Sequence, residues 1–291
     1  MKVYYYAHTG HRIGLDRFRR ASAIIKALEQ QGVEVTLLSS DYRIASVAKE
    51  YGIMRSVGVD VVRNIANIAY QGEKLIFDSD EANPIMLEDM RSYFSTFIHI
   101  NDNPEYIQAD GEFLLNPYLK QSETTCNELI VDAVYEKQQP KTIQKTFFFG
   151  DDDYEKDLLK EVDFLKTIDP YLQLGFYYFL DVETTLEKEF PNHFSFEQYQ
   201  TMIQTTQTLI TASPQAVLES LASGATPIYY QREDYPFYYQ KLFEKLGIPI
   251  INNYNKNELL SALEQAESKK YTKIQTNSYK IAKKLKNWLF L

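Results

Sequence analysis

The stretch Leu209–Ile228 (LITASPQAVLESLASGATPI) constrains the fold of this chain more than any other segment. It begins as a short apolar strand and then forms a helix, because Ser213 is a favourable N-cap and Pro214 suits the first helical position. Gly224 predicts the end of this helix before a second strand at Pro227–Tyr230. Strand, helix and strand in this order are typical of a parallel α/β sheet.

The amino end of this helix has the chemistry of an anion site. Free backbone N–H groups in the first turn of a helix bind phosphate. Glu219 lies further along the same helix, where its carboxylate can accept hydrogen bonds from a diol. A phosphate at the helix start and a sugar beside Glu219 would form a nucleotide site. The alternative is an ordinary crossover with a solvated glutamate.

The chain is long enough for two domains, since its 291 residues exceed a typical domain of about 100–150 residues. Strands and helices alternate in both halves, and the intervening Glu136–Lys145 has no apolar periodicity, so we interpret it as a linker. We expect an α/β protein whose two Rossmann-like lobes face each other across a ligand-binding cleft. The predicted parts are a sugar or acceptor lobe at 1–140, a nucleotide lobe at 141–272, and an amphipathic helix at 273–291 that packs on the body.

Apolar runs and helical spacing predict the individual elements. In the first lobe, Val59–Ala69 is predicted to be helical, and the last strand is predicted at Phe113–Asn116. In the second lobe we expect a helix at Glu155–Lys166 and a strand at Gln173–Leu180.

Charge and composition exclude several classes of protein. The formal net charge of −9 argues against nucleic-acid binding, which needs clustered Lys and Arg. The single cysteine, Cys126, cannot form an internal disulfide or build a zinc site alone. No apolar run approaches the ~18–20 residues of a membrane span, and the first residues are too few and too polar for a signal peptide. We therefore expect a cytoplasmic protein.

The loop after the first predicted strand contains His8 and His11, two of the four histidines in the chain. Histidine is a suitable general base or acid near neutral pH. Gly10 and Gly14 in the same loop permit close backbone approach to a ligand. Their spacing does not match the GxGxxG pattern of dinucleotide-binding folds. The alternative for the whole segment is a flexible surface loop.

Acidic residues follow several predicted strands. The run Gly150–Asp153 could contribute to a Mg²⁺ site, but N-capping of a helix that starts near Tyr154 accounts for it better. Asp78 and Asp102 each follow a strand and are candidate general bases, although a carboxylate at the end of a strand is commonplace.

The C-terminal tail is basic and amphipathic, and its apolar side is predicted to contain Tyr279, Ala282, Leu285 and Leu289. We expect this helix to pack on the body with its lysines solvated. The alternative is a weak peripheral membrane contact through the basic helix and the apolar residues 288–291.

Several blocks of the chain, taken in order, resemble one family. The blocks are IGLDRFRR and the following helix at 13–40, LIFD at 75–78, HINDNPE at 99–105, LLNPYL at 114–119, FFFGDDD at 147–153, and the stretch Leu209–Ile228. They are similar to the glycosyltransferases with two Rossmann lobes, the GT-B fold. They look most like the UDP-sugar hydrolase of pseudaminic acid biosynthesis, which has an IGxGHxxR type of motif in its first loop.

The resemblance implies roles for individual residues. Glu219 would bind the ribose of UDP, while Gly14 and Arg20 would shape the sugar side. The diphosphate would be held by Ser213, Pro214, Gln215 and Ala216.

At two places the chain departs from the pattern of the family. Arg17 stands where the catalytic histidine is expected, with Asp16 in place of the glycine before it, and Gly150–Asp151 stands where the family often has Gly-Gly. Arginine stays protonated and cannot act as a general base, but it can neutralise a departing diphosphate.

We therefore expect an enzyme dependent on a nucleotide sugar, in particular a UDP-sugar. It would be a glycosyltransferase or a nucleotide-sugar hydrolase of bacterial surface-glycan or nonulosonate metabolism. UDP would leave with the help of Arg17, and His11, with His8 as the second candidate, would deprotonate a sugar acceptor or water. GT-B enzymes generally need no bound metal, and no cofactor is expected.

Two alternatives remain open. The first is a non-catalytic protein that binds sugar nucleotides or a partner, since the loop histidine is replaced. The second is a nucleotide-binding α/β protein unrelated to sugars.

Overall fold

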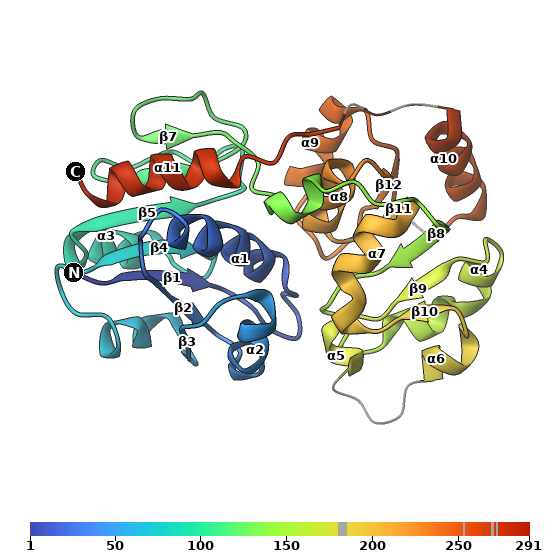
Figure 1. The fold of residues 1–291 in the computed structure, drawn as a ribbon, viewed down its shortest axis with the longest axis horizontal. Coiled ribbons are helices and arrows are strands. Elements are labelled where there is room, and N and C mark those ends of the chain that lie inside the picture. The colour runs from blue at the N-terminus through green and yellow to red at the C-terminus, as the bar shows by residue number, and fades with distance from the viewer. Residues whose placement is uncertain (180–184, 253, 269–270, 272) are drawn as a thin grey trace. The chain divides into compact units, whose positions relative to one another are not determined.

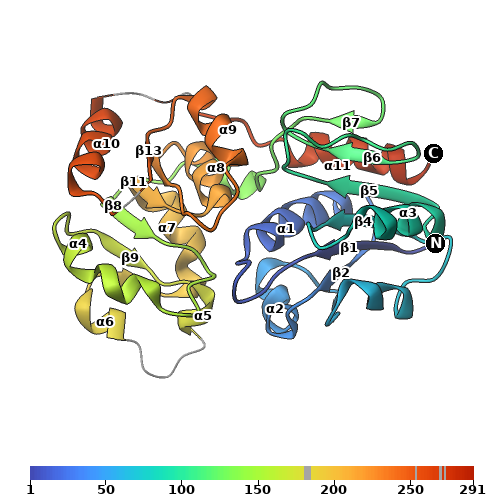
Figure 2. The same cartoon turned by 180° about the vertical axis from the view of Figure 1, so that it is seen from behind.

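The computed structural model describes residues 1–179, 185–252, 254–268, 271 and 273–291. The chain forms two compact units, which are described separately (Figures 1 and 2). Unit 1 comprises residues 1–10, 17–133 and 276–291, and unit 2 comprises residues 11–16 and 134–275. By its contacts the short segment 11–16 belongs to unit 2, although its last residue begins helix α1 (Asp16–Glu29).

Unit 1 is built on a parallel sheet with the strand order β3-β2-β1-β4-β5-β6-β7. The strands are β1 (Val3–Ala7), β2 (Val35–Ser39), β3 (Ser56–Gly58), β4 (Lys74–Asp78), β5 (Thr96–Ile100), β6 (Phe113–Leu115) and β7 (Thr125–Cys126). The three central strands are buried along their whole length, because helices cover both faces of a parallel sheet. This burial explains their almost continuous apolar sequence.

Helices cover the two faces of this sheet (Figures 1 and 2). One face packs Phe77 of β4 against Leu87 of α3 and Ile65 of η2. Right-handed crossovers place α1 on the opposite face, and Gln31 after α1 hydrogen-bonds to α11 through the carbonyl of Tyr279. The helices are α2 (Tyr42–Val47), α3 (Pro84–Tyr93) and α11 (Ser278–Leu289), with the 3-10 helices η1 (Ala48–Tyr51) and η2 (Val62–Asn67). A further 3-10 helix, η3 (Ala133–Glu136), spans the boundary between unit 1 and unit 2.

Unit 2 has a second parallel sheet, with the order β10-β9-β8-β11-β12-β13. Its core packs Phe147, Ile210 and Ile228 of the central strands against α4 and α10. The strands are β8 (Ile143–Phe148), β9 (Tyr171–Gln173), β10 (His193–Phe194), β11 (Thr206–Thr211), β12 (Thr226–Tyr230) and β13 (Ile250–Ile251). The helices are η4 (Asp157–Glu161), α4 (Val162–Lys166), α5 (Phe176–Phe179), α6 (Thr185–Glu189), η5 (Phe196–Gln198), α7 (Tyr199–Thr205), α8 (Pro214–Ala222), α9 (Tyr238–Leu246) and α10 (Lys256–Ser268).

The helix predicted between the two strands at 209–230 is α8. Ser213 is its N-cap, with Oγ accepting a hydrogen bond from the Ala216 N–H at 3.1 Å, and Pro214 is its first residue. Gly224 follows the helix with φ +77°, a left-handed conformation in which glycine carries no steric cost. The predicted start and end of this helix are confirmed.

Several other expectations for single elements are wrong. Within Val59–Ala69 only the 3-10 helix η2 forms, and β7 follows β6, so the strand at 113–115 does not end the first sheet. The predicted helix at 155–166 starts at Asp157 as 3-10 helix and becomes α-helical at Val162.

The predicted strand Gln173–Leu180 is also wrong, because β9 ends at Gln173 and α5 follows; Leu180 lies outside the described residues. Gly175 explains the break. A Cβ added at this glycine would lie 2.2 Å from the carbonyl oxygen of Gly150. The two backbones therefore meet here, and the chain turns instead of extending.

The predicted linker Glu136–Lys145 is without helix or strand from 137 to 142. Strand β8 begins within it at Ile143. Lys141 donates from Nζ to the Gln204 carbonyl at 2.9 Å and to Ser223 Oγ at 3.0 Å. Burial lowers the pKa of Lys141 to about 8. Residues 137–142 have no apolar periodicity, and the hydrogen bonds of the Lys141 side chain hold this segment.

The amphipathic C-terminal helix forms as α11 and packs on unit 1. Tyr279 is exposed, contrary to the prediction, whereas Trp288 is buried and stacks on Phe113 with ring centroids 4.9 Å apart. Leu289 is buried as well, and only Phe290 and Leu291 of the apolar end are exposed. In the described part of the chain, every helix is too short or too polar to cross a bilayer.

Leu285 of α11 is fully buried against unit 1. We expect Leu285→Ala to lower the free energy of unfolding by about 2–5 kcal/mol, the usual cost of truncating a buried leucine. Denaturant titration of the purified protein measures this loss. Lys283→Ala on the exposed side of the same helix is the control, and an equal effect of both changes would contradict the packing described for α11.

Candidate functional site

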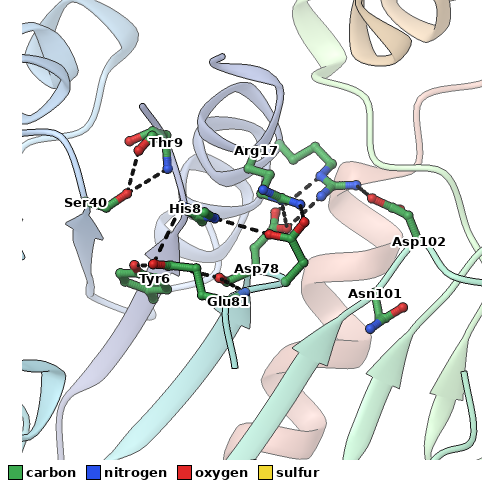
Figure 3. A network of polar contacts seen from close by, with 12 residues as sticks. Tyr6, His8, Thr9, Arg17, Ser40, Asp78, Glu81, Asn101 and Asp102 are labelled. Atoms are coloured by element: carbon green, nitrogen blue, oxygen red, sulfur yellow. Dashed lines mark hydrogen bonds and ion pairs between the residues drawn. The ribbon is translucent and has the colours of Figure 1, made fainter. Parts of the chain in front are cut away.

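Polar side chains gather at the carboxyl edge of the sheet of unit 1, where β1 and β4 end side by side. From β1 the sheet continues to β2 and β3 in one direction, whereas β4 and the strands after it extend in the other. At such a switch point open α/β sheets bind their ligands. Figure 3 shows the network there, including Tyr6, His8, Thr9, Arg17, Ser40, Asp78, Glu81, Asn101 and Asp102.

The buried centre of this network is an ion pair between Asp78 at the end of β4 and Arg20 of α1. Arg20 contacts both carboxylate oxygens, with Nη2 2.6 Å from Oδ1 and Nε 3.2 Å from Oδ2. The Tyr5 hydroxyl donates to Oδ2 at 3.0 Å, and Arg20 Nη1 donates to Asp102 at 2.7 Å. Burial raises the pKa of Asp78, and the two guanidinium groups of Arg20 and Arg17 oppose this rise. Asp78 is thus an anchor for Arg20 and is poorly placed to act as a base.

His8 lies at the exposed end of the network and is paired with a carboxylate. Its Nδ1 is 3.2 Å from Oδ1 of Asp80, and Nη2 of Arg17 is 3.1 Å from Oδ2 of the same residue. The hydrogen bond with His8 and the positive charge of Arg17 hold the pKa of Asp80 below its usual range. With the ring proton on Nδ1, Asp80 orients His8 and leaves Nε2 to accept a proton.

Neighbouring hydrogen bonds fix the backbone around His8 (Figure 3). The Tyr6 hydroxyl donates to Glu81 at 2.5 Å, and a Glu81 oxygen lies 3.7 Å from Nε2 of His8. Thr9 and Ser40 exchange two hydrogen bonds, of 2.8 and 2.7 Å, which join the ends of β1 and β2. His8 therefore lies at a sheet edge whose strand ends are joined by hydrogen bonds.

In unit 2, the amino end of α8 binds a carboxylate. Asp16 Oδ1 accepts the Ser213 hydroxyl at 2.6 Å, and Oδ2 accepts the Gln215 N–H at 3.1 Å. Ala216 N–H bonds to Ser213 Oγ, and Pro214 has no N–H. The donors that sequence analysis assigned to a phosphate are thus bonded to Asp16 and to the cap.

Glu219 is buried inside unit 2. Its carboxylate accepts the Tyr199 hydroxyl at 2.7 Å and the Gln215 amide at 3.0 Å. Because Glu219 is buried beneath these neighbours, a ribose diol can reach this carboxylate only if the side chains around it move. The paired Glu219 does not resemble the solvated glutamate of the alternative interpretation, because its exposed fraction is only 1%.

The three acids after Gly150 point in three directions, so they do not form a common metal site. Asp151 accepts the Phe176 N–H at the start of α5. Asp153 accepts the N–H groups of Asp157 and Leu158 and so caps η4. The capping interpretation is therefore correct for Asp153, but the capped helix begins at Asp157 and not near Tyr154.

Asp152, the middle acid, is almost completely buried. Oδ2 accepts Arg232 Nη1 at 2.7 Å and the Tyr235 hydroxyl at 3.1 Å, while Oδ1 has no hydrogen-bond partner among the described residues. Burial raises the pKa of Asp152 to about 6, although Arg232 favours the ionised form. Gly150 makes room for this side chain, since a Cβ there would lie 2.6 Å from Oδ1, and Gly14 lies next to it, since a Cβ there would be in ordinary contact at 3.6 Å from the Asp152 Cβ.

No protein-family model and no curated protein sequence matches the chain. Solved structures match over nearly its full length. The UDP-GlcNAc 2-epimerase of Methanocaldococcus jannaschii, solved with UDP-GlcNAc and UDP, is similar with a TM-score of 0.62 at 11% identity, covering 99% of this chain and 100% of the other. A spinosyn forosaminyltransferase (TM-score 0.58, 10% identity, 99% and 94% covered) and a spinosyn rhamnosyltransferase complexed with thymidine diphosphate (0.58, 9%, 99% and 96%) are similar too.

The chain has the GT-B fold. The predicted α/β class with two Rossmann-like units is confirmed.

The predicted site residues of this GT-B chain are distributed over both units. In unit 1 the structure brings together His8, Arg17 and Arg20, with Gly10 following in the same loop. The residues found in unit 2 are His11, Gly14, Gly150, Asp151, Ser213, Pro214, Gln215, Ala216 and Glu219. His11 is exposed, and its ring lies 5.0 Å from that of Tyr154. His8 and His11 thus belong to different units, although they are three residues apart in the sequence.

From the sequence alone, Asp80 was not identified as the partner of His8, nor Arg232 as the partner of Asp152. The sequence also did not predict that Asp16 bonds to the amino end of α8. Asp80 and Glu81 belong to an acidic run that directly follows β4, and this run was a usable signal. Arg232 follows β12 in the same way, at a strand end that faces ligands in α/β sheets. Across the described residues, no group of three or more His, Cys, Asp or Glu side chains has the arrangement of a metal site.

The raised pKa of Asp152 has a consequence for stability. Its folded-state value of about 6 exceeds the ordinary 3.8, so its contribution to stability is complete below pH 3.8 and is lost as the pH rises through 6. We expect the stability of the wild type, relative to Asp152→Asn, to fall by about 2.4 kcal/mol between pH 4 and 7, at ~1.4 kcal/mol per unit between the two pKa values.

Denaturant unfolding of both proteins across this pH range measures the difference. Asp163→Asn, which changes an exposed acid in the first turn of α4, is the control and should show no such trend. A pH-independent difference for Asp152→Asn would contradict the burial of its carboxyl group.

Proposed function

We propose that this protein is an enzyme dependent on a nucleotide sugar, a glycosyltransferase or a nucleotide-sugar hydrolase that uses a UDP-sugar. The observation that carries the proposal is the amino end of α8, where the Ser213 hydroxyl and the Gln215 N–H hold an anionic group. Two of the similar structures support it, because one contains UDP-GlcNAc and UDP and another contains thymidine diphosphate.

In this proposal unit 2 binds the nucleotide. The diphosphate takes the place of the Asp16 carboxylate at α8, where hydrogen-bond donors and the helix dipole favour negative charge. The ribose hydroxyls bond to Glu219, displacing the Tyr199 hydroxyl or the Gln215 amide. Both contacts exchange one set of hydrogen bonds for another, so the affinity depends on the whole nucleotide and not on one group.

Unit 1 supplies the base, and we assign this role to His8. The reason is its pairing with Asp80, a carboxylate that stays ionised at neutral pH. A histidine oriented in this way is the usual general base of hydrolytic and transfer reactions. The exposed His11, which the sequence favoured, has aromatic neighbours in Tyr154 and Tyr177.

The proposed reaction follows from these roles. Nε2 of His8 takes the proton from a water molecule or a sugar hydroxyl while that oxygen bonds to the anomeric carbon. The bond from this carbon to UDP breaks, and UDP leaves as the anion. Water gives hydrolysis and a glycan acceptor gives transfer. We place the reaction in bacterial surface-glycan or nonulosonate metabolism on the resemblance of the sequence blocks alone.

We expect His8→Gln to reduce UDP release from UDP-sugars by about 10²–10⁴-fold, the usual contribution of a general base. His11→Gln is the matched control from the same loop and should retain at least a third of the wild-type rate. Coupled detection of UDP across a panel of UDP-sugars, with and without sugar acceptors, measures both. If His11→Gln loses activity while His8→Gln releases UDP normally, the assignment of the base to His8 is wrong.

A second candidate function is non-catalytic binding of a sugar nucleotide or partner. The observation in its favour is Arg17, which replaces the histidine of the resembled family and is paired with Asp78 and Asp80. Calorimetric titration with UDP, ADP and NAD separates the possibilities. UDP binding without release from any UDP-sugar favours the non-catalytic protein, whereas a strong preference for NAD contradicts both sugar-related functions.

A further inference from the structure

The donors at the amino end of α8 have an occupant supplied by the chain itself. Both oxygens of Asp16 are engaged there, at 2.6 Å from the Ser213 hydroxyl and 3.1 Å from the Gln215 nitrogen. This two-point contact imitates two phosphate oxygens on a helix terminus. Asp16 is also the first residue of α1.

We propose that Asp16 is a specificity-determining residue, an internal anion that a diphosphate must displace before it can bind at α8. This inference rests on the proposed function and deepens it. A tethered carboxylate competes at a high effective concentration, which a free ligand overcomes only with additional contacts. A small anion such as pyrophosphate brings none of these contacts. A nucleoside diphosphate brings a ribose and a base, so the site selects it against pyrophosphate.

A second feature of the same place indicates a ligand. Oδ1 of Asp152 is buried without a hydrogen-bond partner among the described residues. It faces the segment that carries Asp16, because a Cβ at Gly14 would lie 3.7 Å from it. A buried acceptor without a donor is costly. The N–H or O–H group of a nucleotide that enters beside Gly14 would satisfy this oxygen, which pyrophosphate cannot do.

The charges already paired at this site determine whether it attracts an anionic ligand. Arg232, the cation nearest to Asp152, is already shared by Asp152 and Asp234 at 2.7 and 2.5 Å. A diphosphate that arrives while Asp16 is still bound meets a carboxylate instead of free helix donors. Displacement of Asp16 is therefore the step that makes the site attractive for an anion.

Asp16→Asn tests the proposal with little change in shape. An asparagine oxygen can still accept the Gln215 N–H, while the hydrogen bond that Ser213 donates to Asp16 is replaced by one that the asparagine amide donates to Ser213 Oγ, so the contact is kept without the charge. Calorimetry compares UDP, inorganic pyrophosphate and uridine on wild type, Asp16→Asn and Asp16→Ala. Asp163→Asn, an exposed acid in the first turn of α4 in the same unit, is the matched control. Thermal unfolding verifies that each variant is folded.

We expect Asp16→Asn to bind UDP about fivefold to thirtyfold more tightly, the range of a charge at a helix terminus. Pyrophosphate should gain measurable affinity, uridine should bind unchanged, and Asp163→Asn should match the wild type. UDP binding that is equal or weaker in both Asp16 variants overturns this inference and leaves the proposed function standing. A lack of UDP and pyrophosphate binding in all the variants overturns both.

Discussion

The ion pair between Arg20 and Asp78 supports the polar site of unit 1. Charges removed from water are tolerated only when their hydrogen bonds are nearly complete, and here Tyr5 and Asp102 complete them. The pair joins α1 to the end of β4. It thereby positions the adjacent Arg17 and the acidic run that holds His8. The arrangement of side chains at the switch point thus depends on a buried ion pair.

The same rule of charge pairing recurs in both units. In unit 1 the guanidinium of Arg17 is balanced by Asp80, and in unit 2 the donors of α8 are balanced by Asp16. Arg232 is balanced by Asp152. Each of these three groups therefore has a carboxylate as its partner. In the proposed function, a ligand would bind by exchanging partners with these carboxylates, which favours selectivity over raw affinity.

Features that depend on residues close together in the sequence were predictable. Contacts between residues far apart in the sequence were not. Ser213 and Gly224 act on their own helix through hydrogen bonds a few residues away, so the bounds of α8 followed from residue types. The pairing of His8 with Asp80 joins residues 72 positions apart and depends on the strand order. The aromatic run after Gln173 has strand character, but the contact of Gly175 with Gly150 overrides it. Tyr279 lies at the margin of the buried face of α11 and is exposed, whereas Trp288 is buried on Phe113, a packing partner that the sequence did not reveal.

Unit 1 is made of separate segments of the chain, and its last segment, 276–291, is synthesised after unit 2. This order affects how the protein can fold during translation. Residues 134–275 of unit 2 are translated before α11, yet α11 covers apolar surface of unit 1, including Phe113. The apolar surface that α11 covers in unit 1 therefore stays exposed while residues 134–275 are synthesised. During that interval the nascent chain exposes surface that chaperones recognise.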